Sequence, residues 1–375
     1  MPLCIGIPKE IKPGEFRVAG LPEHVRRLRQ MGCPVIVQKG AGAGGGWGDS
    51  EYLQAGAELA DDLRGVYARA DLLWKVKEIL PEEFPLVRGC HTIYTYLHAC
   101  PRPEMTRVLR DAGCVAIAYE EITDDQGRRP LLVPMSRLAG TGAILLAGQF
   151  CQSRYGGCGK SLFRTEGAEP LAVTILGAGT AGTAAAEAAT SAGADVAILE
   201  AKESLLPNVQ RAFPLARVLA WSAQALAELL PRTDVLVNCT FWMPGDPHLL
   251  TRDGLALLKR GSLIMDVAAD PRGAIETSEV TTHEDPLRVV DGILHYCVQN
   301  IPSLFARTAS QALAAVTWPY LESIAARGLA EAVRQCPLLR RGVVVWRGAL
   351  VGQDLARTQN VATISPDELL GRLTA

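Results

Sequence analysis

The sequence predicts an α/β fold made of two doubly wound parallel sheets, and three observations support this prediction. The chain has 375 residues, which is too long for one ordinary hydrophobic core. Short apolar runs alternate with helical patterns along most of its length. A glycine-rich turn near the middle joins one apolar run to an alanine-rich helix.

Before residue 134 the chain alternates between strand-like and helical patterns. The strand-like runs are LCIGI, PVIVQ, DLLWKVK, HTIYTYLH and CVAIAYEE. Helical patterns separate them, for example over residues 22–32 and 103–113. Strands that alternate with helices favour a parallel sheet, so this part is predicted to be an α/β domain of its own.

A long helix rich in small residues is predicted over 134–154, where it would connect the two domains. Beyond the glycine turn, further strands are predicted in ARVLAWS, DVLVNCTF, SLIMDVAAD and LRVVDG. The amphipathic helix over 307–328 comes too late to belong to this second sheet, so we expect it to return to the first domain.

The glycine turn lies within residues 171–200, a stretch that reads as strand, turn, helix and strand. Gly177 permits the tight turn, Gly179 lets backbone N–H groups approach a pyrophosphate, and Gly182 lets the helix lie close to the strand. The segment with this dinucleotide-binding pattern consists of Gly177, Ala178, Gly179, Thr180, Ala181 and Gly182. In this context the pattern predicts a Rossmann-like domain.

Glu200 closes the second strand at about the spacing expected for a carboxylate that accepts hydrogen bonds from the adenosine ribose. A carboxylate there would repel a 2′-phosphate. The predicted cofactor is therefore NAD rather than NADP.

These elements predict two Rossmann-like domains that flank an active-site cleft. Residues 1–133 and 305–375 are expected to form a discontinuous substrate domain, and residues 134–304 the NAD-binding domain. Substrate and nicotinamide would meet in the cleft.

Composition excludes several classes of partner. The net charge is −2 with 48% hydrophobic residues, and no basic run points to nucleic acid. The amino terminus lacks an export signal, and no apolar stretch is long enough to span a membrane. We therefore expect a cytoplasmic protein with a small-molecule substrate, and the sequence leaves open whether it forms a homo-oligomer.

The ten cysteines include no C-x-x-C pair. This pattern favours free thiols over a disulfide framework, and no metal site is predicted. Cys151 and Cys158, in the segment CQSRYGGCGK, are the pair in which a contact is most worth testing.

Four residues at predicted strand ends could carry chemistry. Arg17, after the first strand, could hold a carboxylate, or it could be a solvated surface arginine. Lys77, at the end of DLLWKVK, could exchange a proton with an amine if burial lowers its pKa, or it could solubilise a strand edge. His98 closes an apolar strand and is suited to proton exchange. Asp270 could face the nicotinamide or form an Asp-Pro turn.

Seven segments together resemble the superfamily of alanine dehydrogenases, transhydrogenase N-terminal domains and lysine-forming saccharopine dehydrogenases. In order they are GIPKE…EFRVA, LLWKVKE, YTYLH, PMSRLAG, ILGAGTAG, MDVAAD and YCVQNIPS. The resemblance implies that Arg17 binds a carboxylate and that Lys77 and His98 act as acid–base groups. It also implies cofactor and active-site contacts from Ser136, Asp270 and the loop around Asn300.

Some segments are more similar to the saccharopine dehydrogenase branch, namely EEITDDQGRRP, DVLVNCTFW and IPSLFARTAS. That resemblance implies substrate-binding roles for Glu120 and for Arg129, which would hold a further carboxylate. The alternative is that Arg128 and Arg129 are only turn residues.

The combined prediction is an NAD-dependent dehydrogenase that acts on a carbon–nitrogen bond of an amino acid. The preferred substrate is a saccharopine-like or opine-like dicarboxylic secondary amine, and the alternative is alanine, which would give pyruvate and ammonia. Two further hypotheses remain: the chain could be a soluble transhydrogenase domain, or it could bind a nucleotide without catalysis.

Overall fold

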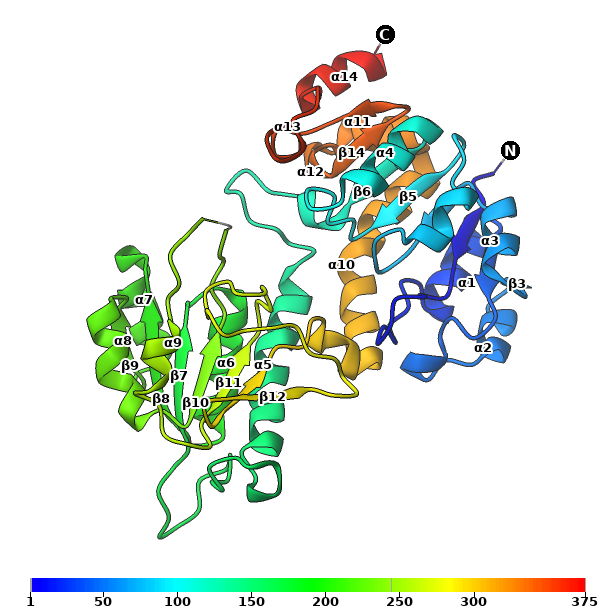
Figure 1. Ribbon diagram of the computed structural model, residues 1–375. Coiled ribbons are helices and arrows are strands. Elements are labelled where there is room, and N and C mark those ends of the chain that lie inside the picture. The colour runs from blue at the N-terminus through cyan, green and yellow to red at the C-terminus, as the bar shows by residue number, and fades with distance from the viewer. Residues whose placement is uncertain (1, 244, 375) are drawn as a thin grey trace. The chain divides into compact units, whose positions relative to one another are not determined.

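The computed structural model describes residues 2–243 and 245–374. The chain divides into two compact units. Unit 1 combines the residues up to Met135 with those from Phe305 onward, and unit 2 is Ser136–Leu304. Each unit contains one mostly parallel sheet with helices, which confirms the predicted α/β class (Figure 1).

The sheet of unit 1 has the strand order β15-β14-β6-β5-β4-β1-β2-β3. Its strands are β1 (Ile5–Ile7), β2 (Val35–Gln38), β3 (Glu58–Ala60), β4 (Leu72–Trp74), β5 (Thr92–Thr95), β6 (Val115–Ala118), β14 (Val343–Trp346) and β15 (Ala349–Leu350). The first six strands are parallel and follow the doubly wound order 3-2-1-4-5-6, so the winding direction changes between β1 and β4. Strands β14 and β15 extend the β6 edge in antiparallel fashion.

Helices and short 3₁₀ turns connect these strands. They are α1 (Pro22–Gln30), η1 (Ala43–Gly45), α2 (Asp49–Gln54), α3 (Leu63–Arg69), η2 (Pro81–Leu86), α4 (Pro103–Ala112), η3 (Tyr119–Glu121), α10 (Ala306–Arg327), α11 (Leu329–Gln335), α12 (Pro337–Arg341), α13 (Gln353–Gln359) and α14 (Pro366–Thr374). Helix α4 shows why the boundaries fall where they do, since proline begins it and Gly113 ends it in the left-handed conformation.

Helix α10 packs within unit 1 although it follows unit 2 in the sequence (Figure 1). The Tyr94 hydroxyl of β5 donates to the carbonyl of Thr317, and the backbone N–H of Val18 donates to Ser310 Oγ, both at 3.0 Å. Helix α10 therefore contacts the loop after β1, which carries Arg17.

The sheet of unit 2 has the order β12-β13-β11-β10-β7-β8-β9. Its strands are β7 (Ala172–Leu176), β8 (Asp195–Glu200), β9 (Arg217–Ala220), β10 (Val235–Asn238), β11 (Leu263–Asp266), β12 (Leu287–Val290) and β13 (Ile293–Tyr296). All but β12 are parallel, and they repeat the order 3-2-1-4-5-6, with the change of direction between β7 and β10.

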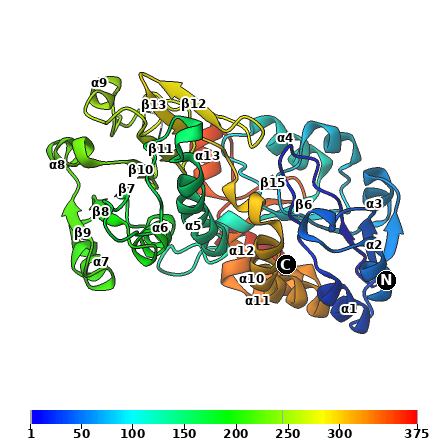
Figure 2. The ribbon, with the colours of Figure 1, turned by 90° about the horizontal axis from the view of Figure 1, so that it is seen from below.

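Helices cover both faces of this second sheet. They and the 3₁₀ turns are α5 (Val133–Phe150), η4 (Ser153–Tyr155), α6 (Thr180–Ser191), η5 (Glu203–Leu205), α7 (Leu206–Ala212), α8 (Ala223–Leu229), η6 (Leu230–Arg232), α9 (Arg252–Leu255) and η7 (Ile301–Phe305). Figure 2 shows α5 and α6 on one side of the strands and α8 and α9 on the other. Helix α5 ends four residues earlier than predicted because Gln152 is extended and a turn follows.

The central strands of both sheets are buried along their whole length, as expected where helices cover both faces. Across the described residues, no helix combines the length and apolarity that crossing a membrane requires.

A buried ion-pair network lies beside the end of β4. The ammonium of Lys75 is wholly buried and lies 2.9 Å from Glu83 and 3.3 Å from Glu10. The Tyr67 hydroxyl donates to Glu83 at 2.7 Å. Burial alone would lower the pKa of Lys75, but the two carboxylates outweigh it and raise that pKa, so the lysine stays charged.

Replacing this lysine should destabilise the protein strongly. Lys75→Met leaves Glu10 and Glu83 buried without their cation, which typically costs about 3–5 kcal/mol of unfolding free energy. Urea denaturation followed by circular dichroism measures the change. Lys39→Met is the control, because Lys39 and its partner Asp61 are exposed and their pair contributes little. Equal effects of the two substitutions would contradict the proposed stabilising role.

Candidate active site

The predicted site residues of unit 1 follow parallel strands near the change of winding direction. Arg17 lies in the loop after β1, Lys77 follows β4, and His98 follows β5. Because the carboxyl ends of parallel strands share one edge of the sheet, these loops gather at that edge. The structure thus brings the three residues to one region of unit 1.

Arg17 is buried and held by its neighbour Glu15. Its Nε and Nη2 atoms donate to the two carboxylate oxygens at 2.7 and 2.6 Å, and Nη1 lies 3.0 Å from the sulfur of Met135. Burial would raise the pKa of Glu15, but the guanidinium outweighs it and lowers that pKa to about 2. The pair fixes the plane of the guanidinium, which excludes the solvated surface alternative for Arg17.

Lys77 is half-buried beside this pair. Burial first, and then the charge of Arg17, lower the pKa of Lys77 to about 8, while Glu15 opposes the shift. Two hydrogen bonds hold the backbone of Lys77. Its carbonyl accepts from the Thr95 hydroxyl at 2.8 Å, and its N–H donates to the Glu10 carboxylate at 3.4 Å. A lysine with a pKa near neutrality can both accept and donate a proton at working pH.

His98 is half-buried, and its backbone is in the left-handed region with φ +46°. Burial and the charge of Lys77 lower the pKa of its imidazole to about 3, against the attraction of Glu78. Glu78 itself accepts from Lys12 at 2.7 Å and from Arg102 at 2.8 Å. The imidazole is therefore neutral near pH 7 and able to accept a proton.

Glu120 lies in η3, directly behind His98. Its carboxylate accepts the backbone N–H of Leu97 at 3.1 and 3.2 Å and also that of His98. Burial raises its pKa to about 7. Glu120 therefore holds the strained backbone of His98, and a direct contact with substrate stays a prediction.

Arg129 lies on the exposed loop after η3. Its neighbour Arg128 pairs with Asp124 at 2.6 Å, and the backbone N–H of Arg128 donates to the same carboxylate at 2.9 Å. The geometry of this segment is that of a surface turn, the alternative that the sequence left open. It gives no support to the argument for a second carboxylate site.

In unit 2 the glycine turn follows β7, next to the loop after β10. Gly177 has φ +88°, and an added Cβ would lie 3.2 Å from the carbonyl oxygen of Cys239. At Gly182 an added Cβ would lie 1.8 Å from the oxygen of Gly177, so any side chain would displace the turn. Gly179, by contrast, has open space around it, and Thr180 is exposed at the start of α6.

Glu200 ends β8 and holds this turn. Its carboxylate accepts the backbone N–H of Ala178 at 2.6 Å and that of Lys202 at 2.8 Å. The acidic side chain thus lies directly beside the turn, as a ribose-binding carboxylate must. Its contact with the ribose stays a prediction.

Helix α5 packs against the same turn. An added Cβ on Gly140 would lie 2.0 Å from the carbonyl oxygen of Ala181. Ser136 lies one helical turn before Gly140 and therefore on the same helix face. The sequence did not single out Gly140, although it lies in the quoted segment PMSRLAG.

Asp266, at the end of β11, anchors the loop that carries Asp270. It accepts from the Asn238 amide at 2.9 Å and from the backbone N–H of Ala269 at 3.2 Å, and Ser278 also donates to it. Asp270 is half-buried, and burial first, then the charge of Asp266, raise its pKa. Asp266 was missed because an acid inside an apolar strand gives no sign of its partners.

Strained backbone occurs in several loops that carry predicted site residues. Among the described non-glycine residues with left-handed φ angles, His98, Ala269, Arg272 and Asn300 (φ +75°) lie in these loops, whereas Asp291, Arg347 and Asn360 lie elsewhere. Such conformations cost about 1–3 kcal/mol each and persist only where the surroundings enforce them. The carbonyl of Asn300 accepts from Ser303 and starts the η7 turn.

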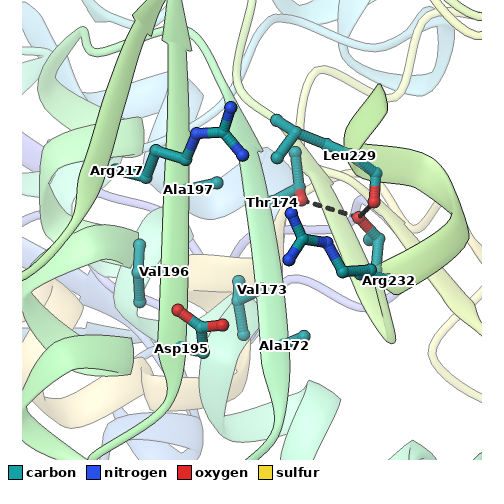
Figure 3. A pocket seen from close by; sticks show the side chains of 10 residues that line it. Ala172, Val173, Thr174, Asp195, Val196, Ala197, Arg217, Leu229 and Arg232 are labelled. Carbon is teal, nitrogen blue, oxygen red and sulfur yellow. Dashed lines mark hydrogen bonds between the residues drawn. The ribbon is translucent and has the colours of Figure 1, made fainter. Parts of the chain in front are cut away.

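A separate small cavity of about 120 Å³ in unit 2 is not part of this site (Figure 3). Ala172, Asp195 and Arg217, which line it, are the first residues of β7, β8 and β9. The cavity therefore lies at the amino ends of the strands, whereas the glycine turn lies at their carboxyl ends.

The residues around the glycine turn fit a dinucleotide. The open space at Gly179 and the start of α6 suit a pyrophosphate, and the acidic Glu200 disfavours a 2′-phosphate. No group of metal-ligating side chains is found among the described residues.

Comparisons with known proteins agree with this geometry. Residues 6–139 match the family model of the alanine dehydrogenase/PNT N-terminal domain, and residues 143–353 match that of the C-terminal domain. The chain belongs to the alanine dehydrogenase/PNT family. This confirms the resemblance found in the sequence.

Relatives in the family are similar over their whole length. Alanine dehydrogenase from Halomonas elongata is 37% identical over 370 residues, which cover 98% of this chain and all of that protein. The enzyme of the same name from Bacillus subtilis is 38% identical over 95% of this chain and 94% of its own length. A solved structure of an L-alanine dehydrogenase superposes with a TM-score of 0.89 at 34% identity, covering 96% of this chain and 99% of that one.

The chain is thus an amino-acid dehydrogenase with two Rossmann-like domains and NAD as its cofactor. The preference for a saccharopine-like or opine-like substrate is not supported, because these full-length relatives are alanine dehydrogenases. The physical argument for that preference required Arg129 as a second carboxylate site, and the surrounding turn is exposed.

The packing at Gly140 should control cofactor affinity. Gly140→Ala forces a methyl group against the backbone at Ala181 and should weaken NADH binding at least about tenfold. Titration of NADH fluorescence measures the affinity. Gly148→Ala in the same helix is the matched control, because its methyl group meets only the Leu162 side chain. Unchanged affinity in Gly140→Ala would show that this helix contact does not shape the turn.

Proposed function

We propose that this family member catalyses the NAD-dependent oxidative deamination of L-alanine to pyruvate and ammonia, together with the reverse amination. The observation that carries the proposal is its similarity to alanine dehydrogenases over nearly the whole of both chains. Arg17, the only arginine that is buried among the described residues, suits a substrate with one carboxylate.

In this proposal the two units have different roles. Unit 1 binds and processes the amino acid, and unit 2 binds NAD through the glycine turn, with Glu200 and Ser136 as contacts. Asn300 contributes a further cofactor contact, and Asp270 acts near the nicotinamide. NAD, when bound, supplies the acceptor for the hydride that leaves the α-carbon.

The residues of unit 1 then carry the proton transfers. Arg17 binds the substrate carboxylate, with Glu15 fixing its guanidinium plane. Neutral Lys77 accepts a proton from the substrate amine, for which a pKa of about 8 is suitable. His98, whose imidazole is uncharged near pH 7, is assigned the proton transfer with the water that attacks the imine.

The substrate assignment is tested by assaying NADH formation at fixed enzyme concentration. L-Alanine with NAD should give robust turnover, whereas saccharopine should give little or none. NADP should be a much poorer cofactor than NAD because of Glu200. Turnover with a dicarboxylic secondary amine but not with alanine would overturn the assignment, and a preference for NADP would remove the role given to Glu200.

The role of Lys77 is tested by substitution and by pH. Lys77→Met should reduce kcat at least about a hundredfold, in line with the loss of an acid–base group. In the unmodified enzyme, the rate of alanine oxidation should rise with pH through about 8, because the amine of Lys77 becomes neutral above its pKa. Lys9→Met, at an exposed position of the same unit, should leave the rate unchanged. A Lys77→Met variant with a near-normal rate would contradict the proposed mechanism but not the substrate.

A further inference from the structure

Two cysteines meet at the ends of a tight loop that follows α5. The backbone N–H of Cys151 donates to Ala147 at 2.9 Å and so ends the helix, and the N–H of Gly159 donates back to the carbonyl of Cys151 at 2.7 Å. The chain leaves Cys151, turns through η4, and returns to it at Cys158 and Gly159. The two side chains come close enough for the thiol of one to shift the pKa of the other.

Glycines and an aromatic contact hold this loop in place. Gly156 has φ +80°. An added Cβ on Gly157 would lie 2.3 Å from the oxygen of Phe150, so the backbone passes directly against the end of α5. The Tyr155 ring packs edge-on against Phe150 with centroids 5.3 Å apart. The close approach of residues 157–159 to Cys151 is therefore built into the backbone.

The two thiols differ in exposure. Cys151 is wholly buried, whereas Cys158 is partly exposed. The hydrogen bond from Cys151 lowers the pKa of Cys158 to about 6 against the effect of burial, and the backbone N–H of Lys160 adds to it. The same contact, together with burial, raises the pKa of Cys151. The negative charge thus resides on the accessible sulfur.

The charged groups around Cys158 are themselves paired. The Lys160 ammonium lies 2.9 Å from Asp234 and 3.3 Å from Glu169, and Lys259 lies 2.5 Å from the second oxygen of Asp234. Asp234 opposes a thiolate, but its charge is neutralised by the two lysines. The backbone donor and the Cys151 thiol therefore decide the charge state of Cys158.

We propose that Cys158 and Cys151 form a reversible oxidation site, in which Cys158 attacks a small disulfide and Cys151 resolves the product. The Cys158 thiolate displaces one thiolate from the small disulfide and forms a mixed disulfide. The Cys151 thiol then gives its proton to the displaced small thiolate and attacks the Cys158 sulfur, which breaks the mixed disulfide and releases the second small thiolate. Two protein thiols are oxidised to one disulfide while one small disulfide is reduced to two thiols.

Other cysteines of the chain provide internal references. Cys90 is exposed, and no contact between it and another cysteine is found among the described residues, whereas burial raises the pKa of Cys114 to about 12. We expect Cys90 to keep an attached small thiol and Cys114 to remain unmodified. Only the pair that follows α5 should form an internal bond.

The test uses the full-length protein in buffers of reduced and oxidised glutathione. Intact mass spectrometry and non-reducing peptide mapping should show a Cys151–Cys158 link that dithiothreitol reverses. In a Cys90→Ser background, Cys151→Ser should retain one glutathione on Cys158, and Cys158→Ser should leave Cys151 unmodified. Alkylation of Cys158 by iodoacetamide should become half-maximal near pH 6.

Three results would overturn the proposal. The first is glutathione on both cysteines without a disulfide between them. The second is a Cys151–Cys158 disulfide that forms only in denaturant, and the third is a disulfide that joins only separate molecules. Dehydrogenase activity plays no part in these readouts, so their outcome is independent of the proposed reaction.

Discussion

Each sheet changes its winding direction beside its first strand, and this constraint decides where chemistry can be located. The change falls between β1 and β4 in unit 1 and between β7 and β10 in unit 2. Loops that leave neighbouring strands at such a point run to opposite faces of the sheet and leave room for a ligand. Unit 1 places charged side chains there, and unit 2 places a glycine turn.

Burial of charge in unit 1 is tolerated because most of the ions are paired. Arg17 is paired with Glu15, and Glu78 with Lys12 and Arg102. For Lys77, no hydrogen bond or ion pair of the ammonium is found among the described residues, so the cost of burial falls on its charged form. The pKa of Lys77 is lowered for this reason. Burial and the charge of Lys77 keep His98 neutral, so only one of these two basic groups carries a charge near pH 7.

The sequence predicts the glycine turn well because each requirement there is local. A tight turn, a close backbone approach and a strand-end acid all follow from spacing within thirty residues. Strand lengths are predicted less well. DLLWKVK reads as one strand, yet β4 ends at Trp74, because the N–H of Val76 donates to the Glu10 carboxylate at 2.6 Å rather than to a neighbouring strand. No apolar pattern can indicate an acceptor that comes from another loop.

The geometry of His98 shows why a site residue can be predicted while its surroundings cannot. Its place at the end of an apolar strand is visible in the sequence, but its left-handed backbone is held by Glu120, which follows a different strand. Arg102, from the start of α4, binds its carbonyl at 3.0 Å and joins it to Glu78. The orientation of the imidazole thus depends on the register of β5 against β6. A change that shifts this register would move His98 without replacing any of the predicted site residues.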